Sequence, residues 1–429
     1  MQTMRTNLGP DRKSLLEVGM PPINGAYPDL MLQPVSDLKV AVISPFPEEG
    51  DTYPQVAYLA KWLRGHASVS WVTIEERGYR LDRLLDDTFL GFLNRFSPSA
   101  LLAPANSLSI PRGSLRGTWR SARQLAADWR SVKQAVVQCD LVLAIDFMAL
   151  VLGAAASSKP LVLWSHDFIS FDEERYRRRI NHWWLSAVRQ ALVRKKRRVI
   201  VQDADRCELL EASLGLEIGS LCPFYLPVSL PPVTSHVGVD CAGAWEGKPR
   251  VMQIGGLSEW RSRTDFLLEQ HKLGHGRFEL LLHGRVQQDV ARQLESLNPK
   301  PILDESWLAC DRIPEVVGQC SVGFVGYTPT DRSFFLLKNA SGQLVEFLRC
   351  GKPVLSMGTN NIAELLESEG AGCGVSNSTD FFGALDRIHA DYRRFSYNAK
   401  VLYDRHYNFE RYSTSLLGFL RGAVDAARS

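Results

Sequence analysis

The chain has 429 residues, of which 45% are hydrophobic and 23% charged, and its formal net charge at pH 7 is +3. These values are typical of a globular protein of about two domains, and they exclude a disordered chain. The small net charge gives no indication of nucleic-acid binding by itself. The sequence contains no run of about eighteen uncharged apolar residues and no apolar leader, so we expect neither a membrane span nor a signal peptide.

Residues 1–36 contain several prolines and show no periodicity, which predicts an N-terminal arm ahead of the first fold element. After this arm, short β-branched runs alternate with amphipathic helical stretches, as in the βαβ units of a doubly wound sheet. The pattern predicts a first Rossmann-like domain over residues 37–235. Its expected strands are residues 38–44, 68–74, 139–145, 159–166 and 197–202.

A stretch rich in proline and glycine, residues 224–249, interrupts this pattern and is predicted to link two domains. A second series of strands and helices then predicts another Rossmann-like domain over residues 236–408. Two such halves in tandem predict a central cleft, where ligands usually bind. The expected strands of the second half are residues 250–256, 277–284, 300–304, 320–327 and 352–357.

Eight cysteines are scattered along the chain without a CxxC pair, and several lie in apolar runs. This pattern is typical of reduced core thiols in a cytosolic protein, and it indicates no zinc site. We therefore expect a cytoplasmic protein that holds no metal.

The segment 341–365 predicts a phosphate-and-ribose site at the start of a helix. Ser341 and Gly342 precede an apolar helical run, so unpaired backbone N–H groups and the positive end of the helix dipole can receive an anion. One turn further, Glu346 offers a carboxylate that can accept bonds from two neighbouring hydroxyls, as a ribose presents. The pattern therefore indicates a nucleotide-sugar enzyme. The alternative is an ordinary αβ unit with an N-capping serine.

His166 ends an apolar strand, and the carboxyl end of such a strand faces the ligand cleft of a doubly wound sheet. We expect His166 to contact the transferred sugar, and Asp167 to orient the loop or the acceptor. The alternative is that both residues cap the next helix. Glu364 could bind nucleotide or sugar, although a first-turn glutamate favoured by the helix dipole explains it equally well.

Residues 174–198 combine ten arginines and lysines with Trp183 and Trp184. Such a basic, tryptophan-bearing helix could lie on the inner face of the cell membrane, which would suit an acceptor carried on a lipid. The alternative is a solvated helix whose tryptophans pack into the first domain. No recognised nucleic-acid-binding module accompanies the cluster, so we expect no nucleic-acid partner.

From about Leu38 onward, the chain resembles the GT-B glycosyltransferases, in particular the family-four-like group of retaining enzymes. The loop that contains Gly50 resembles that family's first glycine-bearing loop, and the strand that ends at His166 is similar to its donor-site strand. Residues 254–269 resemble its phosphate-binding turn. Residues 341–355 resemble its nucleotide-binding helix, and residues 360–375 resemble the glycine-terminated element that follows.

The resemblance implies two Rossmann-like domains that face a central cleft, with the helix 409–429 crossing back to brace the first domain. It also implies transfer of a sugar from a nucleotide-diphosphate sugar to a saccharide or lipid-linked acceptor, with retention and without metal, in cell-surface polysaccharide or glycolipid synthesis. The donor is then a substrate, and no cofactor is expected. In this family the leaving phosphate takes the acceptor's proton, so no carboxylate pair of the glycosidase kind is needed.

The family often has two glutamates separated by seven residues; Glu346 matches the second, and Lys338 stands in place of the first. At the phosphate turn, Gly256 replaces a common arginine and Arg261 takes the place of a lysine. The residues predicted to act on the reacting groups are His166, Asp167, Arg261 and Lys338. Those predicted to bind the donor are Gly50, Gly255, Gly256, Arg263, Asn339, Ser341, Gly342, Glu346 and Glu364.

Two other functions remain open. Non-hydrolysing sugar-nucleotide epimerases share the two-domain scaffold and a serine-glycine turn before a glutamate-bearing helix. Their histidine-glutamate-alanine-glycine segment is not matched by residues 166–169, which favours sugar transfer. A non-catalytic GT-B protein that binds a sugar nucleotide or a membrane partner is the third possibility, because of Lys338 and Gly256.

Overall fold

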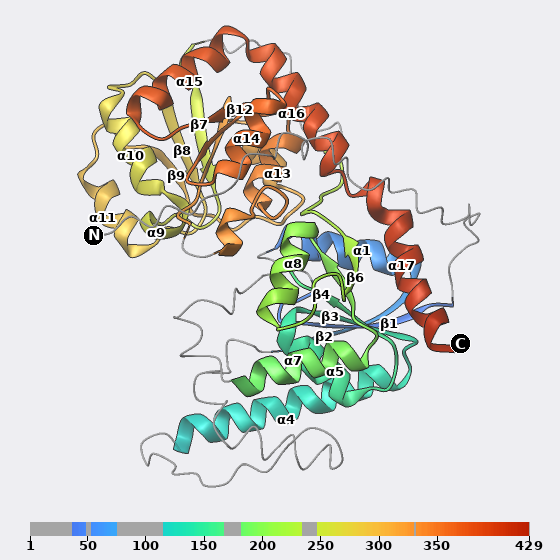
Figure 1. Cartoon of the computed structure of the whole chain (residues 1–429). Coiled ribbons are helices and arrows are strands. Elements are labelled where there is room, and N and C mark those ends of the chain that lie inside the picture. Colours follow the sequence, from blue (N-terminus) through green and yellow to red (C-terminus); the bar gives the residue numbers. More distant parts are fainter. Residues whose placement is uncertain are drawn as a thin grey trace, which may run out of the picture. The chain divides into compact units, whose positions relative to one another are not determined.

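The computed structural model describes residues 37–48, 53–74, 115–166, 182–233, 247–329 and 332–428. These residues belong to one compact unit, which spans Ser36–Ser429. They form two six-stranded sheets in which all paired strands are parallel, with helices between successive strands (Figure 1). The predicted α/β class with two doubly wound sheets is confirmed.

The first sheet has the strand order β2-β1-β3-β4-β5-β6. Its inner strands β3 and β4 are buried along their whole length, as expected when helices cover both faces of a parallel sheet. The strands are β1 Lys39–Ser44, β2 Ser68–Thr73, β3 Leu141–Ile145, β4 Leu161–Trp164, β5 Arg198–Val201 and β6 Cys222–Tyr225. The accompanying helices are α1 Pro54–His66, α4 Leu115–Val137, α5 Asp146–Ala156, α7 His182–Arg194 and α8 Ala204–Ser213.

The second sheet has the order β12-β11-β10-β7-β8-β9. Its strands are β7 Arg250–Ile254, β8 Glu279–His283, β9 Ile302–Asp304, β10 Val322–Gly326, β11 Val354–Met357 and β12 Gly372–Gly374. Its helices are α9 Glu259–Ser262, α10 Thr264–Leu273, α11 Gln288–Ser296, α12 Ile313–Val317, the 3-10 helix η2 Arg332–Phe335, α13 Gly342–Arg349, α14 Asn360–Ser368, α15 Ser378–Ala390 and α16 Tyr392–His406. The chain ends with α17 Glu410–Arg428.

All ten predicted strands are present, and the sequence failed to predict two edge strands, β6 and β12. β6 is short, contains Pro223 and has no fully buried residue, so it lacks the apolar pattern of an inner strand. β12 has three residues, of which two are glycines, and glycine is depleted in strands. Pairing with a neighbouring strand, rather than local propensity, places both segments in their sheets.

The strand order reverses between β1 and β3 in the first sheet and between β7 and β10 in the second. The register pairs Val40 with Leu141 in the first sheet, and Val322 with Val251 in the second. At such reversals the loops after adjacent strands turn to opposite faces of the sheet, which leaves a crevice at the carboxyl ends of the strands. In each sheet the side formed by the carboxyl ends of the strands, here called the carboxyl edge, is therefore suited to ligand binding.

The chain connects the two sheets through residues 226–233 and through the turn between α16 and α17. Leu230 donates its N–H to the carbonyl of Tyr407 at 3.1 Å, and Tyr403 donates its hydroxyl to the carbonyl of Leu230 at 2.7 Å. The linker was predicted to start at residue 224, but β6 extends to Tyr225, so the connecting segment begins at residue 226; Val228 and Leu230 within it are buried.

The C-terminal helix α17 packs on the first sheet, although it follows the second sheet in the sequence. The rings of Phe419 and Phe224 lie 5.4 Å apart between centroids, and the Arg198 guanidinium lies 5.3 Å from the Phe419 ring. The helix predicted over residues 409–429 is observed as Glu410–Arg428. The arm 1–36 and the predicted domain boundary at residues 235 and 236 lie outside the described residues.

The basic segment 174–198 is described only from His182 onward. Within α7, Val188 and Leu192 are buried in the core of the first sheet, whereas Arg189 and Arg194 are exposed. The side chains of Trp183 and Trp184 lie outside the described part, so the predicted membrane contact stays a prediction. Among the described helices, none has the length and apolar character that crossing a membrane requires.

Candidate functional site

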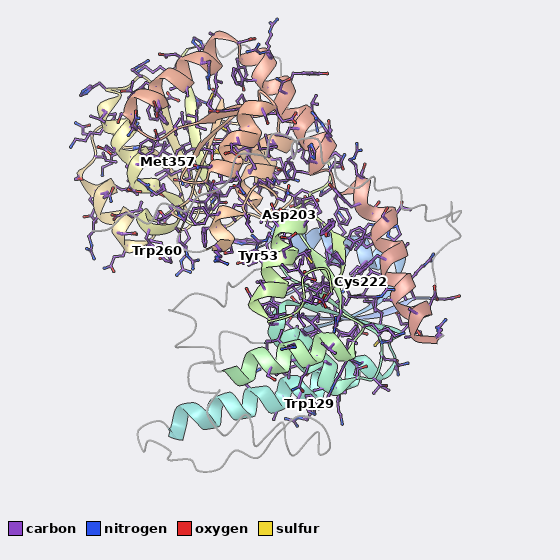
Figure 2. The ribbon with its side chains drawn as sticks, in the orientation of Figure 1. Tyr53, Trp129, Asp203, Cys222, Trp260 and Met357 are labelled. Atoms are coloured by element: carbon purple, nitrogen blue, oxygen red, sulfur yellow. The ribbon has the colours of Figure 1, made fainter. Side chains whose placement is uncertain are left out.

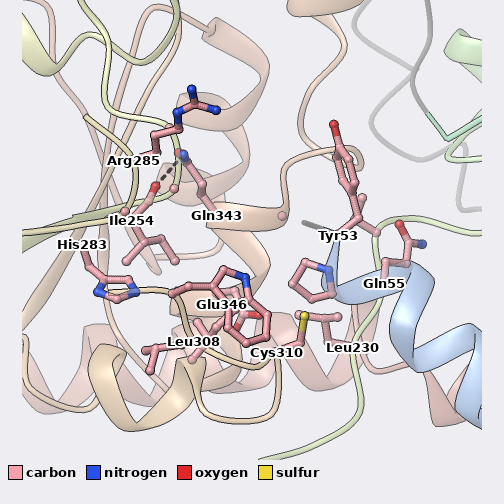
Figure 3. Close-up of a pocket in the computed structure, with 18 of the residues that line it drawn as sticks. Tyr53, Gln55, Leu230, Ile254, His283, Arg285, Leu308, Cys310, Gln343 and Glu346 are labelled. Carbon is pink, nitrogen blue, oxygen red and sulfur yellow. Dashed lines mark hydrogen bonds between the residues drawn. The ribbon is translucent and has the colours of Figure 1, made fainter. Parts of the chain in front are cut away.

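A cavity of about 740 Å³ lies where the carboxyl ends of the two sheets' strands meet (Figure 3). On the second sheet it is lined by Gly255 and Gly256 after β7, by His283, Gly284 and Arg285 at the end of β8, by Tyr327 after β10, and by the start of α13. On the first sheet it is lined by Tyr53, Pro54 and Gln55 at the start of α1, and by His166 after β4. Val228 and Leu230 of the connecting segment, and residues between β9 and α12, complete the lining.

Close approach of two backbones shapes the second-sheet side of the cavity. Gly284 has φ +131°, and a Cβ there would lie 2.0 Å from the carbonyl oxygen of Gly255. Gly255 itself has φ +97°, and a Cβ there would lie 2.9 Å from Nε2 of Gln343, which donates to the carbonyl of Ile254 at 2.6 Å. Glycine is therefore required at both positions. At Gly256, by contrast, a Cβ would meet nothing within 4 Å.

The start of α13 presents backbone N–H groups at the cavity. Ser341 is the N-cap, and its hydroxyl accepts from the N–H of Leu344 at 3.1 Å and lies 2.7 Å from the hydroxyl of Tyr327. Burial raises the pKa of Tyr327 to about 12, so its phenol stays neutral. The N–H groups of Gly342 and Gln343 have no acceptor within the helix, and the helix dipole favours an anion beside them.

The two interpretations of this segment therefore apply to different atoms. The Ser341 side chain is a helix cap, as the structural alternative predicted, and it is 1% exposed. Gly342 and Gln343 line the cavity, as a phosphate site requires. Because the N–H of Leu344 already donates to the Ser341 hydroxyl, an anion at the start of this helix would be bound by the N–H groups of Gly342 and Gln343.

Glu346 lines the same cavity although only 3% of it is exposed. Its Oε2 accepts from Nε of Arg349 at 2.6 Å. Burial raises the pKa of the Glu346 carboxyl above its ordinary value, and the adjacent Arg349 opposes that rise. The position of Glu346, one turn after the N–H groups of Gly342 and Gln343, fits a carboxylate that binds hydroxyls next to a bound anion.

His166 lies in a cluster of aromatic rings on the first-sheet side. Its ring centroid is 4.7 Å from that of Tyr53, 5.5 Å from that of Trp164 and 5.6 Å from that of Phe46. Its backbone N–H donates to Oδ1 of Asp146 at 3.0 Å. Asp146 starts α5 with φ +64°, a left-handed conformation that is uncommon for residues other than glycine.

Asp146 and Arg285 are functional candidates that the sequence analysis missed. Asp146 is buried directly after β3, and it holds the backbone of His166 from twenty positions away. Arg285 is exposed, and it supplies a positive charge at the cavity lining. The signal for both was a charged residue at the carboxyl end of an apolar run, which is the same signal that identified His166.

The predicted phosphate-turn arginines do not line the cavity. Arg261 is exposed, and its guanidinium lies 4.5 Å from the ring centroid of Trp260. Arg263 has φ +51° between α9 and α10, and its Nε lies 3.4 Å from Oδ1 of Asp265. The two side chains therefore contact neighbours within their own turn.

Lys338, Asn339 and Glu364 are also absent from the lining. The carbonyl of Lys338 accepts from the Tyr407 hydroxyl at 2.6 Å, and Asn339 donates from Nδ2 to Oδ2 of Asp203 at 2.9 Å. Asp203, the N-cap of α8, is labelled in Figure 2. Glu364 is exposed in the second turn of α14, so its interpretation as a first-turn glutamate is wrong. Gly50 and Asp167 lie outside the described residues.

Metal binding finds no support in the described part of the chain. No group of three or more histidine, cysteine, aspartate or glutamate residues that could hold a metal ion occurs there. The charges that line the cavity are those of Arg285, Glu305 and Glu346, with His166 and His283 as further titratable groups.

The chain resembles several solved structures over nearly its whole length. No protein-family model matches the sequence, and no curated protein matches it. HepE of Anabaena in complex with UDP-glucose superposes with a TM-score of 0.59 at 18% identity, covering 90% of this chain and 100% of HepE. Sucrose-phosphate synthase from Thermosynechococcus elongatus superposes with a TM-score of 0.60 at 13% identity, covering 91% and 100% of the two chains.

The α,α-trehalose-phosphate synthase (UDP-forming) of Burkholderia vietnamiensis superposes with a TM-score of 0.58 at 13% identity, covering 91% of this chain and 98% of the synthase. At these identities the likeness establishes the fold. The protein therefore has the GT-B fold, which confirms the fold that its sequence motifs predicted.

Proposed function

We propose that the protein is a glycosyltransferase that moves a sugar from a nucleotide-diphosphate sugar to an acceptor hydroxyl. The observation that carries the proposal is the cavity in which the start of α13, Arg285 and Glu346 lie on one side and His166 on the other. Solved structures with this fold include complexes of HepE with UDP and with UDP-glucose. A further solved structure with this fold, of a trehalose-6-phosphate synthase, bears on the mechanism of glycosyl transfer with retention.

In this proposal the second sheet holds the donor. The N–H groups of Gly342 and Gln343, together with Arg285, receive the diphosphate, because amides at a helix start and a guanidinium both favour phosphate oxygens. Glu346 accepts hydrogen bonds from the ribose hydroxyls. Arg261, Arg263 and Lys338 remain predicted phosphate contacts that would have to reach the donor from outside the lining.

The reaction breaks the bond between the sugar's C1 and the β-phosphate oxygen, and forms a bond between C1 and the acceptor oxygen. Positive charge develops on the sugar and negative charge on the leaving phosphate, so fixed cations and amides at that phosphate lower the barrier. The acceptor's proton passes to the departing phosphate oxygen. We propose that transfer proceeds with retention, without a metal or other cofactor, and with His166 against the transferred sugar.

For the acceptor we propose a saccharide or a lipid-linked saccharide, in cell-surface polysaccharide or glycolipid synthesis. The basic segment 174–198 would bring a cytoplasmic enzyme to the inner face of the membrane, where such an acceptor lies. Binding of the protein to vesicles with and without anionic lipid tests this part. Equal binding to both would contradict it.

A ligand panel tests the proposed function directly. A ligand that binds only the folded state raises the melting temperature. We expect stabilisation by uridine or guanosine diphosphate in the presence of a chelator, with the free nucleosides as matched controls. Incubation with nucleotide sugars and acceptors should release nucleoside diphosphate and glycosylate the acceptor. An altered sugar nucleotide without transfer would indicate an epimerase, and the absence of both binding and turnover would refute the proposal.

A further inference from the structure

Arg349 and Glu346 form an ion pair in the interior of the second domain, on the same face of α13. Arg349 is 1% exposed and Glu346 is 3% exposed. Nε and Nη2 of Arg349 both lie 2.6 Å from the same carboxylate oxygen, Oε2. The other oxygen, Oε1, is buried and has no hydrogen-bond partner among the described residues.

The position of the arginine is unusual for a helix that is otherwise packed with apolar side chains. The neighbouring Val345 and Leu348 are completely buried in the core of the second sheet. A buried ion pair is a poor source of stability, because the desolvation of two charges offsets their attraction. A core-facing apolar residue at position 349 would fold the helix at least as well. The pair is therefore better explained by what it does to Glu346.

The guanidinium is anchored from two segments outside α13. Nη1 lies 3.5 Å from the carbonyl oxygen of Pro231, in the segment that connects the two sheets. The guanidinium carbon lies 5.9 Å from the ring centroid of Tyr58, which belongs to α1 of the first sheet. These contacts fix the guanidinium, and through the hydrogen bond from its Nε to Oε2 they also fix the rotation of the Glu346 carboxylate.

We propose that Arg349 is a positioning residue, which grips the Glu346 carboxylate through Oε2 so that Oε1 is kept as an acceptor for a ribose hydroxyl of the donor. This inference rests on the proposed function, because it assumes that a nucleotide occupies the cavity. Arg349 itself is not a lining residue and touches no donor atom; it acts through Glu346.

The electrostatic surroundings explain why the arginine is needed. Burial raises the pKa of Glu346 above its ordinary value, and Arg349 opposes the rise. Tyr58 on α1, Tyr403 on α16 and Cys350 beside the pair also have pKa values raised by burial, so they carry no balancing charge at neutral pH. The other ionisable groups at the cavity are His166, His283, Arg285, Glu305, Tyr53, Tyr327 and Cys310.

Without Arg349, desolvation would act unopposed and the pKa of Glu346 would rise further. A carboxyl with a raised pKa is protonated below that pKa and ionised above it. Nucleotide binding to a variant without the arginine should therefore be weak at neutral pH, and should recover as the pH rises through the new pKa. A purely structural role would weaken binding by the same factor at every pH.

The test measures the affinity of the full-length protein for uridine and guanosine diphosphate by calorimetry between pH 6.5 and 9. Arg349→Met removes the charge at similar length, and Arg349→Lys restores it. Hydrogen bonds to charged groups contribute about 1.5–3 kcal/mol, so we expect roughly tenfold or greater weakening for Arg349→Met at pH 7. The ratio of variant to parent affinity should approach one at high pH, and Arg349→Lys should recover most of the loss.

Arg394→Met is the matched control. Arg394 forms an ion pair with Asp391 at the same spacing of three residues, but on the exposed surface of α16. It should bind nucleotide like the parent. If Arg349→Met does not fold, the double variant Glu346→Gln/Arg349→Met removes both buried charges, and it should fold and bind weakly at every pH.

The outcomes separate the two proposals. If the parent protein binds no nucleoside diphosphate, the proposed function and this inference are both refuted. If the parent binds and Arg349→Met binds equally well, or more weakly by a factor that is independent of pH, only the positioning role is overturned. A double variant that binds as tightly as the parent would overturn it too.

Discussion

The carboxyl edges of the two sheets differ in chemistry, although both lie at a reversal of strand order. The second-sheet edge is built from glycines, helix-start amides, Arg285 and Glu346, which suit an anion with hydroxyl groups beside it. The first-sheet edge presents His166 among the rings of Phe46, Tyr53 and Trp164. The difference teaches that one fold, used twice, can present two chemistries: backbone amides and charges suited to an anion at one edge, and an imidazole among aromatic rings at the other.

The largest effect should come from removing the close approach on the second-sheet edge. Gly284 has φ +131°, and even a Cβ added there would lie 2.0 Å from the carbonyl oxygen of Gly255, so Gly284→Val would force a branched side chain into occupied space. Strain and overpacking together should lower the free energy of unfolding by about 3 kcal/mol or more, measured in urea, and abolish nucleotide binding. Gly256→Ala is the control, because its Cβ meets nothing within 4 Å. Parent-like stability of Gly284→Val would show that this edge is not built as described.

The first-sheet edge should affect turnover rather than affinity. His166→Phe keeps an aromatic ring beside Tyr53 and removes the ring nitrogens. We expect kcat to fall by about a hundredfold, as for loss of one group that stabilises a transition state, with unchanged affinity for nucleoside diphosphate. Steady-state kinetics and calorimetry on the same variant check both quantities. A parallel loss of affinity would mean that both edges hold the nucleotide.

Variants of Arg285 and Arg261 compare a phosphate contact inferred from the cavity lining with one predicted from the sequence alone. Arg285→Ala should weaken nucleoside diphosphate binding about tenfold through loss of a charge-assisted bond, and should leave binding of the nucleoside unchanged. Arg261→Ala should have a smaller effect, because that guanidinium contacts Trp260 instead of the cavity. The reverse order of the two effects, measured by calorimetry, would restore the original phosphate-turn prediction.

The smallest effect should come from adding a charge to the second-sheet edge. Gly256 lines the cavity and faces open space, at the position where the resembling family commonly has an arginine. Gly256→Arg should tighten nucleoside diphosphate binding two- to fivefold, since an exposed ion pair contributes about 0.2–1 kcal/mol. The gain should shrink as salt is added. A loss of affinity in calorimetry would indicate that the site needs this space to be empty.

The sequence by itself determined the two sheets and several of the residues at their edges. Apolar runs such as residues 141–145 and 322–326 are buried along their whole length, so their composition alone indicates inner parallel strands. Gly255 directly follows β7, His166 lies two residues after the end of β4, and Glu346 lies one turn into α13. They could be predicted because chain geometry brings the ends of parallel strands and the first turns of the helices that follow them to the ligand-binding side of the sheet. Local pattern and position within an element carry this information.

Only the tertiary structure decided how the side chains at those edges are paired. Asn339 is bonded to Asp203, 136 positions away, and Asp146 is bonded to the backbone of His166. The same holds for the guanidinium of Arg349, which reaches Pro231 from α13. These pairings depend on strand order, register and loop paths, which bring distant residues within 3 or 4 Å of each other. A hydrogen bond is sensitive to such distances, whereas the hydrophobic periodicity of a sequence is not.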